Sequence, residues 1–121
     1  MGDSDDLRGG GFLEALYETD RKSHTLVNQA ILVLERNGPS EGSPLVDTVV
    51  GSVMANLKEL RPGSATESEV RILFAFDPWR SAILLVAGDK SGRGKSWYRD
   101  AIPEAERLYR GYLQEREGEG A

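Results

Sequence analysis

The sequence predicts an α+β fold in which helices pack on one face of a small antiparallel sheet. Segments 57–61, 70–76 and 82–87 have the character of strands, and the last two are rich in Ile, Leu, Val and Phe. Helical periodicity precedes and follows these segments. The connections between them are much shorter than a parallel crossover requires, so the strands are expected to form an antiparallel meander of three or four strands.

Turn residues separate the three predicted strands. Pro62 and Gly63 lie between the first and the second strand, and Asp77 and Pro78 lie between the second and the third. Proline presets φ for a turn, and glycine accepts a positive φ. Both connections are therefore predicted to contain turns.

Two helices are predicted before the sheet. Residues 12–18 carry apolar side chains at helical spacing, and Thr19 is a candidate N-cap for a second helix. In the second helix, apolar residues recur at i, i+3, i+4 and i+7 until Gly38 and Pro39 stop it. The apolar positions are Val27, Ala30, Ile31 and Leu34. We therefore expect an N-terminal helical hairpin.

A C-terminal helix is expected to begin near Pro103, because proline suits the first turn of a helix. Segment 40–52 is predicted to be a polar connector between the helical hairpin and the first strand. The chain is expected to divide into a disordered arm at 1–11, one domain at 12–113 and a flexible tail at 114–121.

Composition narrows the class of protein. The chain has 121 residues, enough for one domain with its own core. It has no cysteine, which removes disulfides and Cys-ligated metals and is typical of a reducing compartment. No apolar run approaches the length of about 18 residues that a membrane span needs. We expect a cytoplasmic protein without a membrane partner.

The charge is unevenly distributed along the chain. The formal net charge is −5, yet residues 57–99 hold eight Lys or Arg against five Asp or Glu, a local balance of +3. The flanks, 1–56 and 100–121, carry −5 and −3. An acidic chain is a poor non-specific binder of nucleic acid, but a basic central sheet allows one local anion site.

The segment 88–96, GDKSGRGKS, resembles a phosphate-binding P-loop but has the wrong spacing. Five residues separate Gly88 from Gly94 where the motif has four, and the residue at the correct offset is Asp89, whose carboxylate would repel a phosphate. His24 is the single histidine, and without a second histidine or a cysteine it is expected to be a surface or packing residue. No metal site is predicted.

The same loop combines cations with aromatic residues, which can neutralise phosphates and stack on unpaired bases. The residues are Lys90, Arg93, Lys95, Trp97, Tyr98 and Arg99. A second interpretation has equal weight at this point. The cations would be solvated and the aromatic residues would pack under the C-terminal helix.

The strands favour an anion site. Arg61 ends the first strand and Arg71 opens the second, so an antiparallel turn places both at one end of the sheet, close to Lys90. Lys58 is expected to point to the opposite face unless a bulge intervenes. Cations and a phenol suit cleavage of RNA by its own 2′-hydroxyl, which needs a base, charge stabilisation and an acid. A lysine could be the base if neighbouring cations lower its pKa.

Several motifs occur together in a specific order. K-E-L-R at 58–61 is followed by R-I-L-F-A-F at 71–76, G-D-K at 88–90 and W-Y at 97–98, and the upstream connector reads G-P-x-x-G-x-P-L-V. With these motifs the chain resembles the RelE/HigB superfamily of bacterial toxins, in its phage-derived HigB-like branch. The resemblance covers about residues 12–113.

The resemblance implies a RelE-like fold and the toxin of a type II toxin–antitoxin system. Such a toxin is a metal-independent endoribonuclease without a cofactor that cleaves mRNA, often on the ribosome, and is neutralised by a helix-turn-helix antitoxin. By motif position the catalytic candidates are Lys58, Arg61, Arg71, Lys90 and Tyr98. Arg93, Lys95, Trp97 and Arg99 are the RNA-binding candidates, with less weight on Arg93 and Lys95.

Two features depart from the family pattern. The family begins with a strand, whereas residues 3–11 have no strand pattern, so one sheet edge could be open and could pair two copies of the chain. The acidic total charge is unusual for a toxin that acts on the ribosome. The alternative is therefore a catalytically attenuated relative that serves as a protein-interaction module.

Overall fold

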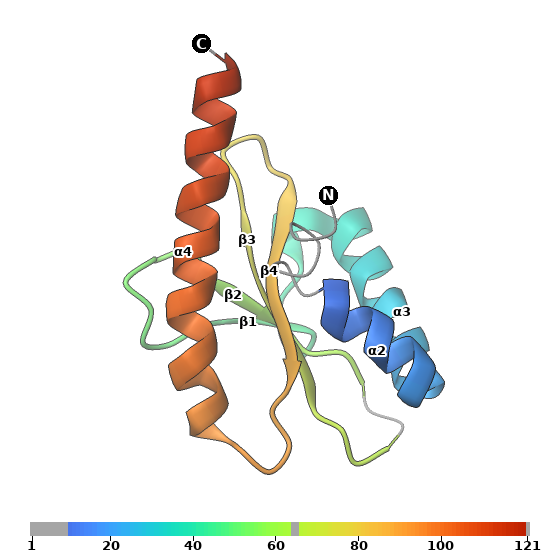
Figure 1. The fold of residues 1–121 in the computed structure, drawn as a ribbon. Coiled ribbons are helices and arrows are strands. Elements are labelled where there is room, and N and C mark those ends of the chain that lie inside the picture. Colours follow the sequence, from blue (N-terminus) through green and yellow to red (C-terminus); the bar gives the residue numbers. More distant parts are fainter. Residues whose placement is uncertain (1–9, 64–65, 121) are drawn as a thin grey trace.

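A computed structural model describes residues 10–63 and 66–120, and it has the predicted α+β class. Two helices come first, and four strands and a long helix follow a short 3-10 turn (Figure 1). The elements are α2 (Gly10–Thr19), α3 (Arg21–Asn37), η1 (Gly38–Ser40), β1 (Val46–Thr48), β2 (Lys58–Leu60), β3 (Val70–Phe76), β4 (Ala82–Asp89) and α4 (Lys95–Gly120).

The four strands form one antiparallel sheet in the order β1-β2-β3-β4, which confirms the predicted meander. Leu60 pairs with Val46 on one side and with Ile72 on the other. At the start of β3, Arg71 pairs with Gly88 of β4. An irregularity between Leu73 and Phe74 shifts the register of β3 against β4.

Helices cover both faces of the sheet, so the prediction of helices on one face is wrong. Figure 1 shows α4 on one side of the strands and α2 with α3 on the other. The two long strands, β3 and β4, therefore supply apolar side chains to two cores. The core under α2 and α3 contains Leu16, Val27, Ala30, Leu34, Val46, Leu60, Val70, Ile72 and Phe74. The core under α4 contains Leu57, Leu73, Ala75, Leu85, Trp97, Ala101, Ala105 and Tyr109.

The N-cap of α3 is Asp20, one residue after the predicted Thr19. The Asp20 side chain accepts a hydrogen bond from the Ser23 backbone N–H at 3.2 Å. Thr19 still belongs to α2, where its hydroxyl donates to the Ala15 carbonyl. The predicted end of the helix is confirmed, because Gly38 caps α3 with a φ of 60°.

The C-terminal helix begins at Lys95, eight positions before the predicted start, and Pro103 lies inside it. Trp97, Ala101 and Ala105 explain the difference, because they are four residues apart and form the buried face of α4 that packs on the sheet. Their burial outweighs the cost of an internal proline, about 3 kcal/mol in a helix interior. The helix continues to Gly120 through most of the predicted tail.

The fourth strand, β1, lies inside the segment predicted to be a connector. It has three residues, too few for an alternating pattern to be visible in the sequence. The predicted arm at 1–11 and the absence of an N-terminal strand fall mostly outside the described residues, and Gly10 and Gly11 already belong to α2. Within the described part of the chain, no helix has both the length and the apolarity to cross a membrane.

Candidate functional site

Strand alternation places three charged side chains on the α4 face of the sheet. Leu60 and Ile72 are register partners whose side chains lie in the core under α2 and α3. Their neighbours in sequence, Glu59, Arg61 and Arg71, therefore point to the opposite face. The prediction that Arg61 and Arg71 share one end of the sheet is confirmed by this register.

Arg61 is held between two carboxylates. Its Nε donates to Glu59 Oε1 at 2.7 Å, and its terminal nitrogen lies 3.2 Å from Asp47 Oδ2 on β1. The hydrogen bond to Glu59 and the charges of both carboxylates raise the pKa of Arg61. About 41% of the Arg61 side chain is exposed, so the guanidinium is oriented and still accessible to an anion.

Glu59 is a buried carboxylate with unused capacity to accept hydrogen bonds. The residue is 4% exposed, and within the described residues Glu59 Oε2 has no hydrogen-bond partner at 3.5 Å or less. The Tyr98 phenol is its nearest candidate donor, since hydrogen bonding to Glu59 contributes to the raised pKa of Tyr98. Arg71 is similar, because its terminal nitrogen donates to the Val70 carbonyl while the buried Nε has no acceptor in the described parts of the chain. Buried polar groups are rarely left unpaired, so these two atoms set the cluster apart from an ordinary core and make it a candidate site.

Tyr98 brings a phenol from α4 to the same cluster. Burial raises the pKa of Tyr98 to about 12, the neighbouring Glu59 carboxylate adds to the rise, and Arg71 opposes it. The phenol is therefore protonated at any physiological pH. It can donate a hydrogen bond or a proton next to two guanidinium groups and a carboxylate.

These residues open into a groove of about 380 Å³. Such a volume lies within the range of about 300–1,000 Å³ that is common for small-ligand sites. Lys95 adds a cation at the start of α4, and two valines from the loop between β1 and β2 add apolar surface. The lining residues are Val49, Val50, Glu59, Arg61, Lys95 and Tyr98.

Two predicted catalytic lysines do not join this cluster through any contact that the described residues make. Lys58 lies on the α2 and α3 side of the sheet, as alternation predicts, and its ammonium is 3.5 Å from the Thr48 hydroxyl. Lys90 follows β4 at the predicted end of the sheet, where it pairs with Glu69 Oε2 at 3.5 Å. The contacts of Lys58 and Lys90 therefore give no support to a lysine base crowded by other cations.

The RNA-binding candidates divide between surface and core. Trp97 is 6% exposed and packs so close to Gly88 that a Cβ there would lie 2.5 Å from the indole Nε1. The packing interpretation therefore holds for Trp97, which has no free ring face for a base. Arg93 pairs with Asp100 and contacts Ser96, and Arg99 is exposed on α4.

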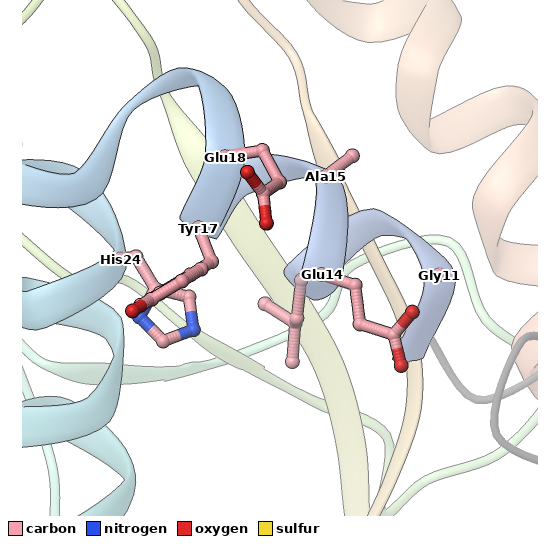
Figure 2. Close-up of a pocket in the computed structure, with 7 residues that line it drawn as sticks. Gly11, Glu14, Ala15, Tyr17, Glu18 and His24 are labelled. Atoms are coloured by element: carbon pink, nitrogen blue, oxygen red, sulfur yellow. The ribbon is translucent and has the colours of Figure 1, made fainter.

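A larger hollow, about 630 Å³, lies on the helical hairpin. Figure 2 shows that Glu14, Tyr17 and Glu18 of α2 and His24 of α3 line it. The Tyr17 and His24 rings meet edge to face at 5.1 Å, which fits the predicted packing role of the histidine. Two carboxylates make this hollow unsuitable for a phosphate, so its size does not make it the candidate site.

Glu59 was not among the predicted site residues, because these were chosen from cationic and aromatic side chains. Strand alternation was a usable signal, since a residue two positions before Arg61 must share its face. No three His, Cys, Asp or Glu side chains are grouped as metal ligands within residues 10–63 and 66–120.

Comparisons with known proteins identify the family. Residues 14–110 match the family described as "Phage derived protein Gp49-like (DUF891)". A protein of Mycobacterium tuberculosis named "Putative toxin HigB2" is 56% identical over 94 residues, which are 78% of this chain. The match spans 47% of that relative, so the chain covers about half of its length.

A second relative from the same organism aligns over most of both chains. It is named "Putative toxin HigB3" and is 44% identical over 104 residues, 86% of this chain and 89% of the relative. No solved structure matches the chain. The resemblance seen in the sequence is thus confirmed, and the chain belongs to the Gp49-like family of phage-derived proteins within the HigB-like toxin superfamily.

Proposed function

We propose that this protein is the toxin of a type II toxin–antitoxin system and that it acts as an endoribonuclease on mRNA. The names of both relatives support the first part of the proposal. The observation that carries the second part is the clustering of Glu59, Arg61 and Tyr98 on one groove, with Arg71 next to the Tyr98 phenol. A carboxylate, two guanidinium groups and a protonated phenol suit the cleavage of a phosphodiester.

The reaction assigns one task to each group. The Glu59 carboxylate takes the proton of the 2′-hydroxyl, whose oxygen attacks phosphorus and forms the new P–O2′ bond. The P–O5′ bond breaks, and Tyr98 gives its proton to the departing 5′-oxygen. The guanidinium groups of Arg61 and Arg71 stabilise the negative charge that develops on the phosphate. The products are a 2′,3′-cyclic phosphate and a 5′-hydroxyl.

Glu59 replaces lysine as the base because of its position. Lys58 lies on the other face of the sheet, and Lys90 is paired with Glu69. Lys95 lines the groove and is exposed, which suits electrostatic attraction of an RNA strand. Arg93 and Arg99 are exposed as well and would contribute to the same electrostatic attraction.

The test is incubation of a labelled mRNA with the purified protein, with and without ribosomes and in the presence of EDTA. We expect EDTA-resistant cleavage that leaves 2′,3′-cyclic phosphate ends, in at least one of the two conditions. Absence of cleavage in both conditions, or cleavage that EDTA abolishes, would contradict the proposal. Expression of the wild-type protein should arrest growth, and Arg71→Ala should remove that arrest.

The partners follow from the same proposal. A helix-turn-helix antitoxin should bind the protein and suppress its activity. The protein should bind its mRNA substrate either free in solution or on the ribosome.

The alternative, an attenuated interaction module, has one observation in its favour. Arg61 is already paired with Asp47 and Glu59, so a phosphate must compete for it. Binding of an antitoxin without RNA cleavage would support this alternative.

A further inference from the structure

The loop between β1 and β2, residues 49–56, places unusual apolar surface beside the groove. Val50 is 91% exposed and Val53 is 86% exposed, while Val49 and Met54 pack against the core under α4. Val50 and Val49 line the groove together with Arg61, Lys95 and Tyr98, whereas Val53 does not. Two valines of one loop are thus almost equally exposed, but they differ in their relation to the site.

The loop is fixed by a buried carboxylate on α4. Glu106 Oε2 accepts hydrogen bonds from the Ser52 hydroxyl at 2.6 Å and from the Val53 N–H at 2.8 Å. The Ser52 oxygen in turn accepts the Met54 N–H at 3.0 Å. Gly51, with a φ of 94°, makes the turn that lifts Val50 away from this anchor. The exposure of Val50 therefore comes from a held conformation of the loop.

The groove combines two kinds of surface that a nucleotide requires. Arg61 and Lys95 attract a phosphate, and the valine side chains offer an apolar surface of the kind that covers a nucleobase. We propose that loop 49–56 forms the base-contacting wall of the site, with Val50 packed on the unpaired nucleobase next to the scissile phosphate. This inference rests on the proposed ribonuclease function. It assigns the loop, through Val50, a part in the choice of cleavage site.

An RNA base is favoured over a protein as the occupant because Val50 belongs to a groove that also contains cations and a phenol. Val53, which lies outside the groove, provides a matched control. Both side chains are exposed, so replacement by serine should not disturb folding.

The experiment compares Val50→Ser and Val53→Ser with the wild-type protein. The probe is a fluorescein-labelled single-stranded RNA with one 2′-deoxynucleotide at the position that the wild-type protein cleaves, so that it binds without reacting. We expect Val50→Ser to weaken binding about three- to tenfold, because apolar contact area is lost, and to raise KM more than it lowers kcat. It should also redistribute the cleavage sites on a natural mRNA. Val53→Ser should match the wild-type protein in all three measurements.

The outcomes separate the inference from the function on which it rests. If the wild-type protein does not cleave RNA, the proposed function fails. If the wild-type protein cleaves but Val50→Ser behaves like Val53→Ser, the function stands and the inference is overturned. Equal losses in both variants would also overturn it, since they would indicate a broad surface such as one for a protein partner.

Discussion

The two faces of the sheet come from the same strands but differ in chemistry. The face under α2 and α3 is covered by aliphatic and aromatic side chains such as Leu60, Ile72 and Phe74. The α4 face has its own apolar core, but at the start of β3 it changes to Glu59, Arg61 and Arg71. Each charged residue is the direct neighbour in sequence of a buried apolar residue. A change of function on one face therefore need not alter the packing of the other.

The polar end of the α4 face is costly for folding. A buried carboxylate with an unpaired oxygen and a buried guanidinium nitrogen without an acceptor both reduce stability. No such unpaired side-chain atom occurs on the α2 and α3 face among the described residues. Unpaired buried polar groups that reduce the stability of a fold are expected mainly at functional sites, where function requires them. This difference between the faces is the physical argument for placing the chemistry under α4.

The largest effect is expected when the charge of Glu59 is removed. Glu59→Gln keeps the size of the side chain and an oxygen for the Arg61 Nε–H, but it removes the base. We expect the single-turnover rate of RNA cleavage to fall about 100-fold or more, which corresponds to about 2.7 kcal/mol of activation free energy. The single-turnover rate is measured from the cleavage of a labelled RNA with the enzyme in excess.

The control for this variant comes from the other face. Lys58→Met removes the charge next to Glu59 in sequence, but its ammonium contacts Thr48 away from the groove. Its cleavage rate should stay within about threefold of the wild-type rate. Equal losses in Glu59→Gln and Lys58→Met would contradict the division of labour between the two faces.

The second effect concerns how closely α4 approaches the sheet. At Gly88, which faces Arg71 in the register, an added Cβ would lie 2.5 Å from Trp97 Nε1 and 3.0 Å from Cε2. Gly88→Ala is expected to cost about 1–3 kcal/mol, because the indole must move in a packed core. Tyr98 follows Trp97 in the sequence and should be displaced together with the indole, so the rate of RNA cleavage should also fall. Urea denaturation monitored by tryptophan fluorescence measures the loss of stability.

Gly111→Ala is expected to have the opposite effect on the stability of the protein. Gly111 lies inside α4, and nothing within 4 Å would meet its added Cβ. Alanine should stabilise the helix by up to about 1 kcal/mol through its higher helix propensity. If both substitutions destabilise the protein equally, the contact between Gly88 and Trp97 is not what sets the position of α4.

The sequence predicted elements well where one pattern dominates. Residues 70–76 were predicted with their observed bounds, because seven consecutive positions favour a strand and proline marks the following turn. Arg61 and Arg71 were placed together by antiparallel geometry alone. By contrast, β1 was missed because three residues carry no period. The start of α4 was missed because Pro103 was given more weight than the four-residue spacing of Trp97, Ala101 and Ala105.

The candidate site was only partly predictable for a related reason. Cations can be counted in a sequence, but the burial of Glu59 and the anchoring of loop 49–56 depend on α4. A family resemblance also treats Trp97 and Tyr98 as one motif. On α4 they are adjacent and point differently, so the indole enters the core while the phenol reaches the groove. Only tertiary packing separates a structural from a functional aromatic residue here.

The smallest effect is expected when the hydrogen bonds between Glu106 and loop 49–56 are weakened. The hydrogen bond from Ser52, together with the Val53 N–H and Arg110, lowers the pKa of Glu106 below its ordinary value of 4.5, although burial opposes this. A carboxyl whose folded pKa is lowered stabilises the fold above its unfolded pKa, and this contribution disappears as the pH falls through the folded pKa. Thermal unfolding should therefore show wild type more stable than Glu106→Gln at pH 7, with the difference shrinking below about pH 4.5. Glu115→Gln, an exposed change on the same helix, controls for the lost charge. A difference that stays constant down to pH 3 would mean that the Glu106 charge does not hold the loop.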